Sequence, residues 1–147
     1  MSPRPGQPQE RERQVRRIDQ DGAAAAAGLL DTTLDAKRAK ELRTRYRQLR
    51  AMLHSAGLAA TYAFVAARTA SAELGESYRK VAEALRRRLT GRGLLTGDPA
   101  TMTPADVLGQ LGGMDVVAYA RASAEAAALL GWLSRLADAT YQQRDGA

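Results

Sequence analysis

Apolar residues recur at steps of three and four positions along nearly the whole chain, and no stretch alternates between apolar and polar residues. A period near 3.6 residues is typical of a helix with one buried face, whereas a half-buried strand has a period of two. Two stripes are especially regular: Leu42, Tyr46, Leu49 and Leu53, and then Leu74, Tyr78, Val81, Ala82, Leu85 and Leu89. The pattern predicts an all-α chain in which these stripes are buried.

Capping residues and glycines indicate where the helices of the first half begin and end. The periodicity predicts a first helix over residues 9–30. Thr32, followed three residues later by Asp35, has the spacing of a capping box and predicts the start of a second helix. Gly57 interrupts that helix, and residues 58–68 resume the helical spacing. We therefore expect two helices that meet at a bend.

The second half contains a loop between helical segments. Ser71 predicts the start of a fourth helix, which ends in a loop of about a dozen glycine-rich residues, either mobile or ordered by a partner. Thr103 and Pro104 then provide a cap and a first-turn proline for a short helix. Asp115 caps a last helix that runs to about residue 142. The residues that this helix is expected to bury are Leu129, Trp132, Leu133 and Leu136.

These segments predict one compact helical bundle of five main helices plus a short one. The chain has 147 residues, enough for a single core. Three prolines and a glycine within residues 1–8 predict a disordered, proline-rich leader, so the α-helical domain is expected to cover residues 9–147.

The chain contains no cysteine and no apolar stretch long enough to span a bilayer. Its first residues also lack the apolar region of a signal peptide. We expect a cytoplasmic protein without a membrane partner.

Catalytic chemistry is poorly represented. His54 is the only histidine, and no phosphate-binding loop, dinucleotide fingerprint or metal-ligand cluster is present. Next to Leu53 at the end of the second helix, His54 is expected to pack or to bind the last carbonyl groups rather than to act as a general base. The sequence therefore predicts a protein that is not an enzyme and needs no cofactor or metal.

Positive charge is concentrated in the larger, N-terminal part of the chain. The formal net charge is +6; residues 1–92 hold 19 Lys and Arg against 10 Asp and Glu, whereas residues 93–147 hold 3 against 6. A basic region of this kind favours a polyanionic partner, because binding to phosphates releases counterions. The alternative interpretation is an arginine-rich composition without a specific partner.

The second helix carries a regular set of cations. Lys40, Arg43, Arg47 and Arg50 fall within about 80° on a helical wheel, beside the apolar stripe. Such a face can bind phosphates while the stripe packs inward, but an ordinary solvated face has the same pattern. Few aromatic residues are expected to be exposed for base stacking, so any nucleic-acid binding should be independent of sequence.

Two segments, residues 45–68 and 124–139, resemble the small subunit of the CRISPR type III-B Cmr effector complex. The first segment has Gly57-Leu58 opening a helix that carries Ala63-Phe64 and ends at Arg68. The second has Glu125, Trp132-Leu133 and Arg135 in the closing helix. Leu136 stands where a phenylalanine is common, and residues 50–53 lack a proline. These departures leave open the small subunit of the sister Csm complex.

The resemblance implies a non-catalytic subunit that stacks head to tail in several copies as a short filament. Its partners would be the other Cmr subunits, the guide RNA and the target RNA. Lys40, Arg43, Arg47 and Arg50 are candidate RNA contacts from helical geometry, and Arg68 and Arg135 from their position in the resemblance. An ion pair of Arg135 with Asp138, or with Glu125 of a neighbouring copy, is an alternative.

A second function class also fits the composition. A small basic helical regulator or adaptor would dimerise through Trp132 and Leu133 and bind DNA or a protein partner. A helix-turn-helix reader requires a polar second helix. The helix after Gly57 is too apolar to lie in a DNA groove, which disfavours this alternative.

Overall fold

The computed structural model describes residues 8–145, although not the side chains of Gln14 and of residues 142–145. All regular structure in this part of the chain is helical, which confirms the predicted all-α class. The six helices are α1 (Pro8–Leu29), α2 (Ala36–Ala56), α3 (Leu58–Ala67), α4 (Gly75–Gly91), α5 (Pro104–Gly112) and α6 (Val116–Asp145). The predicted leader lies outside the described residues except for Pro8, which is the first residue of α1.

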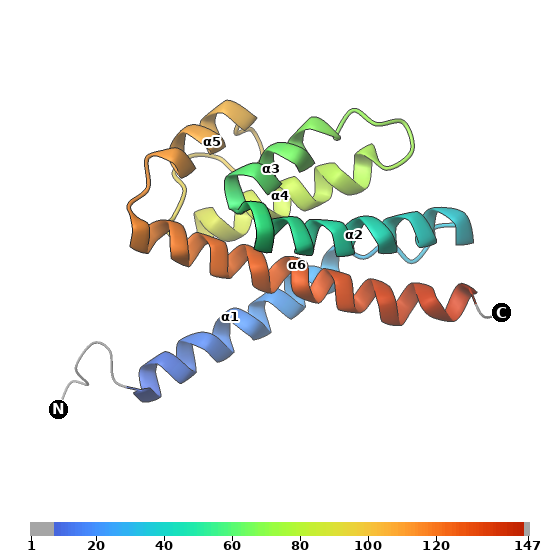
Figure 1. The fold of residues 1–147 in the computed structure, drawn as a ribbon, viewed down its shortest axis with the longest axis horizontal. Helices are drawn as coiled ribbons and strands as arrows, with labels where there is room; N and C mark the ends of the chain where they lie inside the picture. Colours follow the sequence, from blue (N-terminus) through green and yellow to red (C-terminus); the bar gives the residue numbers. More distant parts are fainter. Residues whose placement is uncertain (1–7, 146–147) are drawn as a thin grey trace.

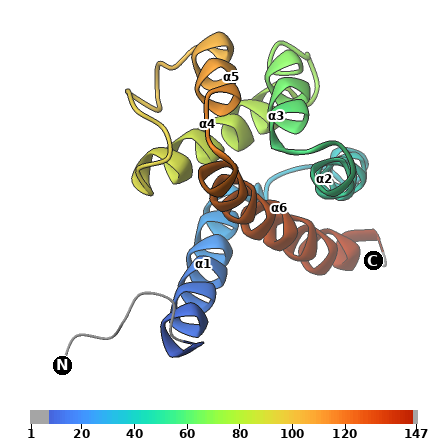
Figure 2. The same cartoon turned by 60° about the vertical axis from the view of Figure 1, so that its left-hand side comes forward.

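The long helix α6 organises the fold, because α1, α2, α3 and α4 all contact it. α1 and α2 lie on different sides of α6, α3 and α4 contact a further part of it, and α5 packs against α3 (Figures 1 and 2). The first half of α1 projects away from the other helices, and most of its side chains are exposed. Only the second half of α1 therefore belongs to the packed part of the molecule.

The predicted apolar stripes form the core. All four stripe residues of α2 are buried, as are the five stripe residues on α4 and Leu74, which immediately precedes α4. On α6, Leu129 and Leu133 are fully buried, but Trp132 and Leu136 are only partly buried against the core. The prediction for these last two residues was too strong, because both lie at the edge of the stripe that faces α2 and α4.

Two predicted helix starts are wrong. The N-cap of α2 is Asp35, whose side chain accepts a hydrogen bond from the Arg38 N–H, so Thr32 does not cap this helix. α4 begins at Gly75 rather than after Ser71. The preceding chain forms tight turns, and a Cβ at position 75 would lie 2.7 Å from the Thr69 carbonyl oxygen. Gly75 is thus required for this close approach.

The other predicted boundaries agree with the structure. Gly57 separates α2 from α3 and has a φ of +93°, a conformation that favours glycine. Thr103 and Asp106 form a capping box at the start of α5. The Asp115 side chain accepts a hydrogen bond from the Ala118 N–H and so caps α6. Local sequence signals were sufficient at these three positions.

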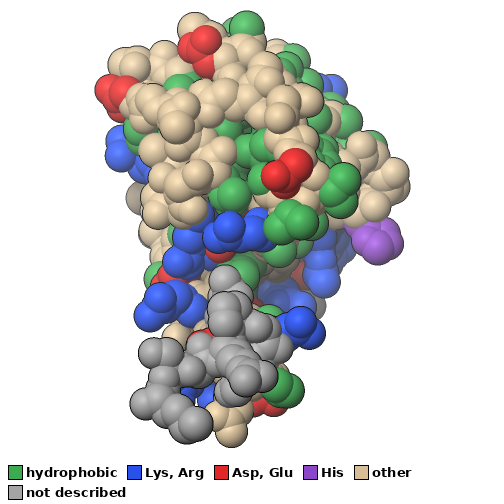
Figure 3. Space-filling model, turned by 90° about the vertical axis from the view of Figure 1, so that its left-hand side faces the viewer, with side chains coloured by type: hydrophobic (Ala, Val, Ile, Leu, Met, Phe, Trp, Pro, Cys, Tyr) green, Lys and Arg blue, Asp and Glu red, His purple; other side chains and the backbone are tan. Residues whose placement is uncertain are grey.

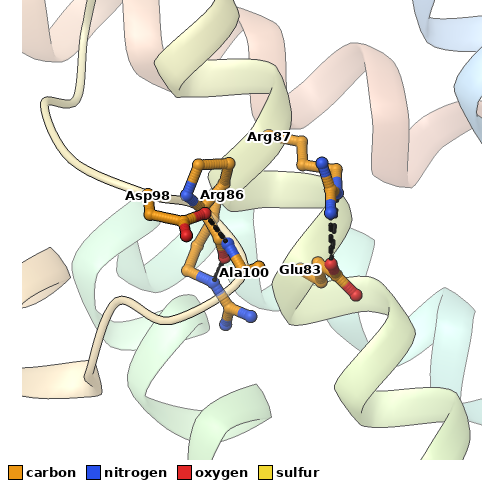
Figure 4. Close-up of polar contacts among 6 residues, drawn as sticks. Glu83, Arg86, Arg87, Asp98 and Ala100 are labelled. Carbon is orange, nitrogen blue, oxygen red and sulfur yellow. Dashed lines mark hydrogen bonds and ion pairs between the residues drawn. The ribbon is translucent and has the colours of Figure 1, made fainter.

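The loop between α4 and α5, residues 92–103, is held by contacts within the chain. Leu95 and Met102 are buried, and Arg86 donates from Nε to the Pro99 carbonyl oxygen at 2.6 Å and from Nη1 to the Tyr62 hydroxyl at 3.1 Å. Figure 4 shows Arg86 reaching from α4 towards this loop, with Asp98 hydrogen-bonded to the Ala100 N–H. These contacts within the chain disagree with the expectation that the loop is mobile, and contact of the loop with a partner stays a prediction.

Candidate nucleic-acid interface

A groove with a volume of about 1010 Å³ lies between α1, α2 and α6. Its charged and polar lining includes Arg47, Arg50 and His54 from α2, Arg135 and Asp138 from α6, and Asp19 from α1. Three of the six candidate cations, Arg47, Arg50 and Arg135, therefore meet in one place. The sequence placed only the first two of these on a common face.

Small residues on α6 create the groove. Ala124, Ala127, Ala128 and Gly131 follow one another at helical steps of three, one and three, and all four line it. Because none has a side chain larger than a methyl group, the space between the flanking helices α1 and α2 stays open on this face. The alanine-rich composition thus shapes the site directly.

α1 is fixed against the groove by one close approach and one polar contact. A Cβ at Gly22 would lie 3.0 Å from the Ala128 Cβ, so the two helices are almost in backbone contact there. Asp19 accepts a hydrogen bond of 2.8 Å from the Trp132 indole N–H. Asp21 pairs with Arg92. Both acidic residues of this part of α1 therefore have partners on other helices.

Asp138 joins α6 to the basic face of α2. Its Oδ1 lies 2.8 Å from Arg43 Nε and 2.8 Å from Arg47 Nη2. Burial acts against ionisation of this carboxyl, but the hydrogen bonds from Arg43 and Arg47 outweigh it, and the pKa of Asp138 lies below its usual value. Arg43, with 20% of its side chain exposed, is mainly occupied within the protein, whereas Arg47, at 55%, remains accessible.

Arg135 lies over an aromatic ring. Its guanidinium carbon is 5.3 Å from the centroid of Trp132, within the range of a cation–π contact. The alternative pairing of Arg135 with Asp138 is wrong, because Arg43 and Arg47 bind that carboxylate instead. The Arg135 side chain is exposed.

Lys40 and Arg50 are the least engaged of the predicted cations. Both side chains are exposed on α2, and neither makes an ion pair within the part of the chain that the structure describes. Arg50 lines the groove, whereas Lys40 lies two turns or more away along the same face.

Arg68 is separate from this group. Its guanidinium carbon lies 3.3 Å from the centroid of the Phe64 ring, and its Nη1 donates to the Phe64 carbonyl oxygen. Arg68 is also the C-cap residue of α3 and does not line the groove. The structure thus gives this residue a local packing role.

His54 does not have the expected position. The N–H of Gly57 caps α2 by donating to the Leu53 carbonyl oxygen, and the His54 side chain is exposed at the edge of the groove. The expectation that His54 packs inward was wrong because the stripe residue Leu53, and not its neighbour, faces the core.

A buried ion pair was missed by the sequence analysis. Arg88 and Glu125 approach to 2.8 Å, and Arg92 Nε lies 3.1 Å from the second oxygen of Glu125. Glu125 and Asp138 are thus neutralised by arginines of the first 92 residues. The charge separation along the sequence is therefore partly cancelled in space, because α6 packs against the basic helices.

No group of three or more His, Asp or Glu side chains in residues 8–145 is arranged to hold a metal ion. None of the helices in this region combines the length and the apolar character that crossing a bilayer requires.

The alternative of a dimer through Trp132 and Leu133 conflicts with the packing. Leu133 is 0% exposed and belongs to the core of its own chain. Trp132 is partly buried between its contacts with Asp19 and Arg135. Leu133 therefore cannot contribute to a dimer surface in this fold, whereas Trp132 is partly exposed in the groove.

The family model described as CRISPR-associated protein (Cas_Cmr5) matches residues 18–140. No curated protein and no solved structure matches the chain. The family match includes α2 to α5 and most of α1 and α6, and hence all of the groove. The chain therefore belongs to the Cas_Cmr5 family, the small subunit of the type III-B CRISPR effector complex.

Proposed function

We propose that this chain is a non-catalytic structural subunit of the cytoplasmic effector complex, where several copies stack and help to hold the guide and target RNA. RNA is held through phosphate contacts that are independent of sequence. Its other partners are the larger Cmr subunits. The proposal combines the family with the groove described above.

The observation that carries the RNA contact is the convergence of Arg47, Arg50 and Arg135 on one groove from α2 and α6. Guanidinium groups bind phosphate oxygens in a bidentate manner, and several of them on one surface follow a backbone without reading its bases. Lys40 extends the same face of α2 along the helix.

The candidate cations are not equivalent in this proposal. Arg50 and Arg135 are exposed and free of carboxylates within the described residues, so they are the main phosphate contacts. Arg47 shares Asp138 with Arg43 and contributes less. Arg43 and Arg68 support the positions of α6 and α3, and their effect on RNA is indirect.

Support for stacking comes from an apolar corner at the start of α6. Val116 and Val117 are 86% and 69% exposed. Beside them is a shallow pocket whose lining includes Ala59, Leu108 and Met114. Figure 3 views the side of the molecule where α5, the start of α6 and α1 lie, with hydrophobic side chains gathered above a basic region. Exposed apolar surface of this kind is typical of protein contacts.

The test is a pair of double variants with identical charge changes. Arg50→Glu with Arg135→Glu reverses two cations of the groove, and Arg45→Glu with Arg121→Glu reverses two exposed cations on other faces of the same two helices. In the assembled complex we expect the groove variant to lower target-RNA retention at least ~10-fold, with a weaker salt dependence, and the control to stay near wild type. Equal retention by both variants contradicts the RNA contact.

A further inference from the structure

We propose that the groove between α1, α2 and α6 holds an unstacked base of single-stranded RNA, with the neighbouring phosphates at the surrounding arginines. The inference rests on the proposed function, because it requires RNA on this surface. It goes further by assigning the small-residue floor a ligand: a nucleotide whose base leaves the RNA stack.

The size and floor of the groove fit such a ligand. Sites for small organic ligands have volumes of about 300–1,000 Å³, and this groove is at the upper end of that range with about 1010 Å³. Its floor on α6 is formed by Ala124, Ala127, Ala128 and Gly131. A floor of methyl groups and backbone is smooth and apolar, so it can contact the face of any of the four bases.

One wall offers a stacking surface. The Arg135 guanidinium lies 5.3 Å from the centroid of Trp132, and Trp132 is held in place by its hydrogen bond to Asp19. RNA bases that leave a helix commonly stack on aromatic rings and on guanidinium planes. Because Asp19 fixes the indole, little side-chain entropy is lost when a base packs beside it.

The charged walls and the apolar floor of the groove match the two parts of a nucleotide, its phosphate and its base. Arg47 and Arg50 lie on the opposite wall, on α2, and Arg135 lies on α6. A phosphate on either side of the base can therefore meet a guanidinium group, while the apolar floor between the walls excludes charge. An acidic peptide would satisfy the arginines but would leave the flat floor without a matching group.

A steric variant tests the base without removing any cation. Gly131 lines the groove, and a Cβ added there meets no other atom within 4 Å, so Gly131→Phe introduces a bulky side chain at the floor of the groove. The matched control is Gly28→Phe, which has the same open space outside the groove. The probe is a single-stranded RNA of about 15 nucleotides, longer than one ordinary binding site. Its retention is measured on the assembled complex, with the melting of each free variant as a folding check.

We expect Gly131→Phe to weaken retention of the probe about 10-fold, the effect of losing one stacked base, while the Gly28→Phe control matches wild type. A single abasic nucleotide, placed in turn at each position of the probe, should at one position weaken wild type to a similar degree and leave the Gly131→Phe variant unchanged. Equal binding of normal and abasic probes overturns the inference. Loss of Cmr subunits rather than RNA from the Gly131→Phe complex also overturns it, because the groove would then hold protein.

A second measurement does not depend on a variant that folds. Wild-type complex is irradiated with the probe carrying 5-iodouridine, which forms adducts with nearby aromatic side chains, and the adducts are mapped by mass spectrometry. An adduct at Trp132 supports the inference, and its absence overturns it. If the double reversal of Arg50 and Arg135 still weakens RNA retention while both base tests fail, the proposed function stands and only the base assignment is lost.

Discussion

Arg88 Nε lies 2.8 Å from a carboxylate oxygen of Glu125, and the two side chains are only 7% and 6% exposed. Arg88 also donates from Nη2 to the Ile18 carbonyl oxygen at 2.8 Å. The pair thus connects α4 with α6 and with the middle of α1. Charges at this depth are stable only while each has its partner.

Replacing Glu125 should therefore destabilise the fold strongly. Glu125→Gln leaves the Arg88 guanidinium buried without a counter-charge, and we expect a loss of about 3–5 kcal/mol in the free energy of unfolding. The melting temperature, measured by circular dichroism, should fall by roughly 10 °C. The control is Glu83→Gln, which removes an exposed ion pair with Arg87 one turn away and should cost about 0.5 kcal/mol or less. Equal losses would contradict the buried pair.

A second prediction concerns the carboxylate that competes with RNA for arginine. Asp138→Asn removes the acceptor shared by Arg43 and Arg47 and leaves the more exposed Arg47 guanidinium available for phosphate. We expect RNA retention by the assembled complex to increase several-fold and its salt dependence to steepen, because more phosphates can be neutralised. The matched control Asp106→Asn removes one negative charge from the α5 cap, outside the groove. A similar increase with both variants would indicate a general charge effect.

The same carboxylate sets a pH dependence. The pKa of Asp138 is lowered in the folded protein, so its contribution to stability is fully present above the unfolded value of about 3.9. It is lost as the pH falls through the lower folded value. Because the side chain is 35% exposed, we expect a contribution of about 1 kcal/mol or less. Denaturant unfolding should show a larger unfolding free energy for wild type than for Asp138→Asn at pH 7, and the difference should shrink as the pH falls below the unfolded value of about 3.9.

The features of this structure that could be predicted from the sequence depend on residues that are close to one another in the chain. The buried stripes and the Thr103 and Asp115 caps follow from residues three or four positions apart, which share a helix face or turn. The groove was only half predictable. Arg47 and Arg50 share a face of α2, but Arg135 joins them because α6 packs beside α2. The Arg88–Glu125 pair had no local signal either, since its partners come from distant helices.

The contact between α1 and α6 can be tested through Trp132, the only tryptophan of the chain. A Cβ at Gly22 would lie 3.0 Å from the Ala128 Cβ and 3.1 Å from its carbonyl carbon. Gly22→Val should therefore push α1 away, break the Asp19 contact and shift the tryptophan emission to the red. We expect a loss of about 1–3 kcal/mol in unfolding free energy. Gly28→Val, with open space around its Cβ, should leave the emission unchanged. An unshifted Gly22→Val spectrum would contradict the close packing.

The last prediction concerns the apolar corner at the start of α6 and its effect on assembly of the complex rather than on folding of the chain. Val116 is 86% exposed, so Val116→Glu removes no core contact and should change the unfolding free energy by about 0.5 kcal/mol or less. In the proposed stack, however, the new carboxylate would be buried against another subunit without a partner, which is costly. We expect the variant to be incorporated into the purified complex in fewer copies, as measured by native mass spectrometry. Val15→Glu introduces the same charge on the projecting half of α1, where valine is 65% exposed. Wild-type copy number with Val116→Glu would exclude the corner as a stacking surface, and equal loss with both variants would point to charge alone.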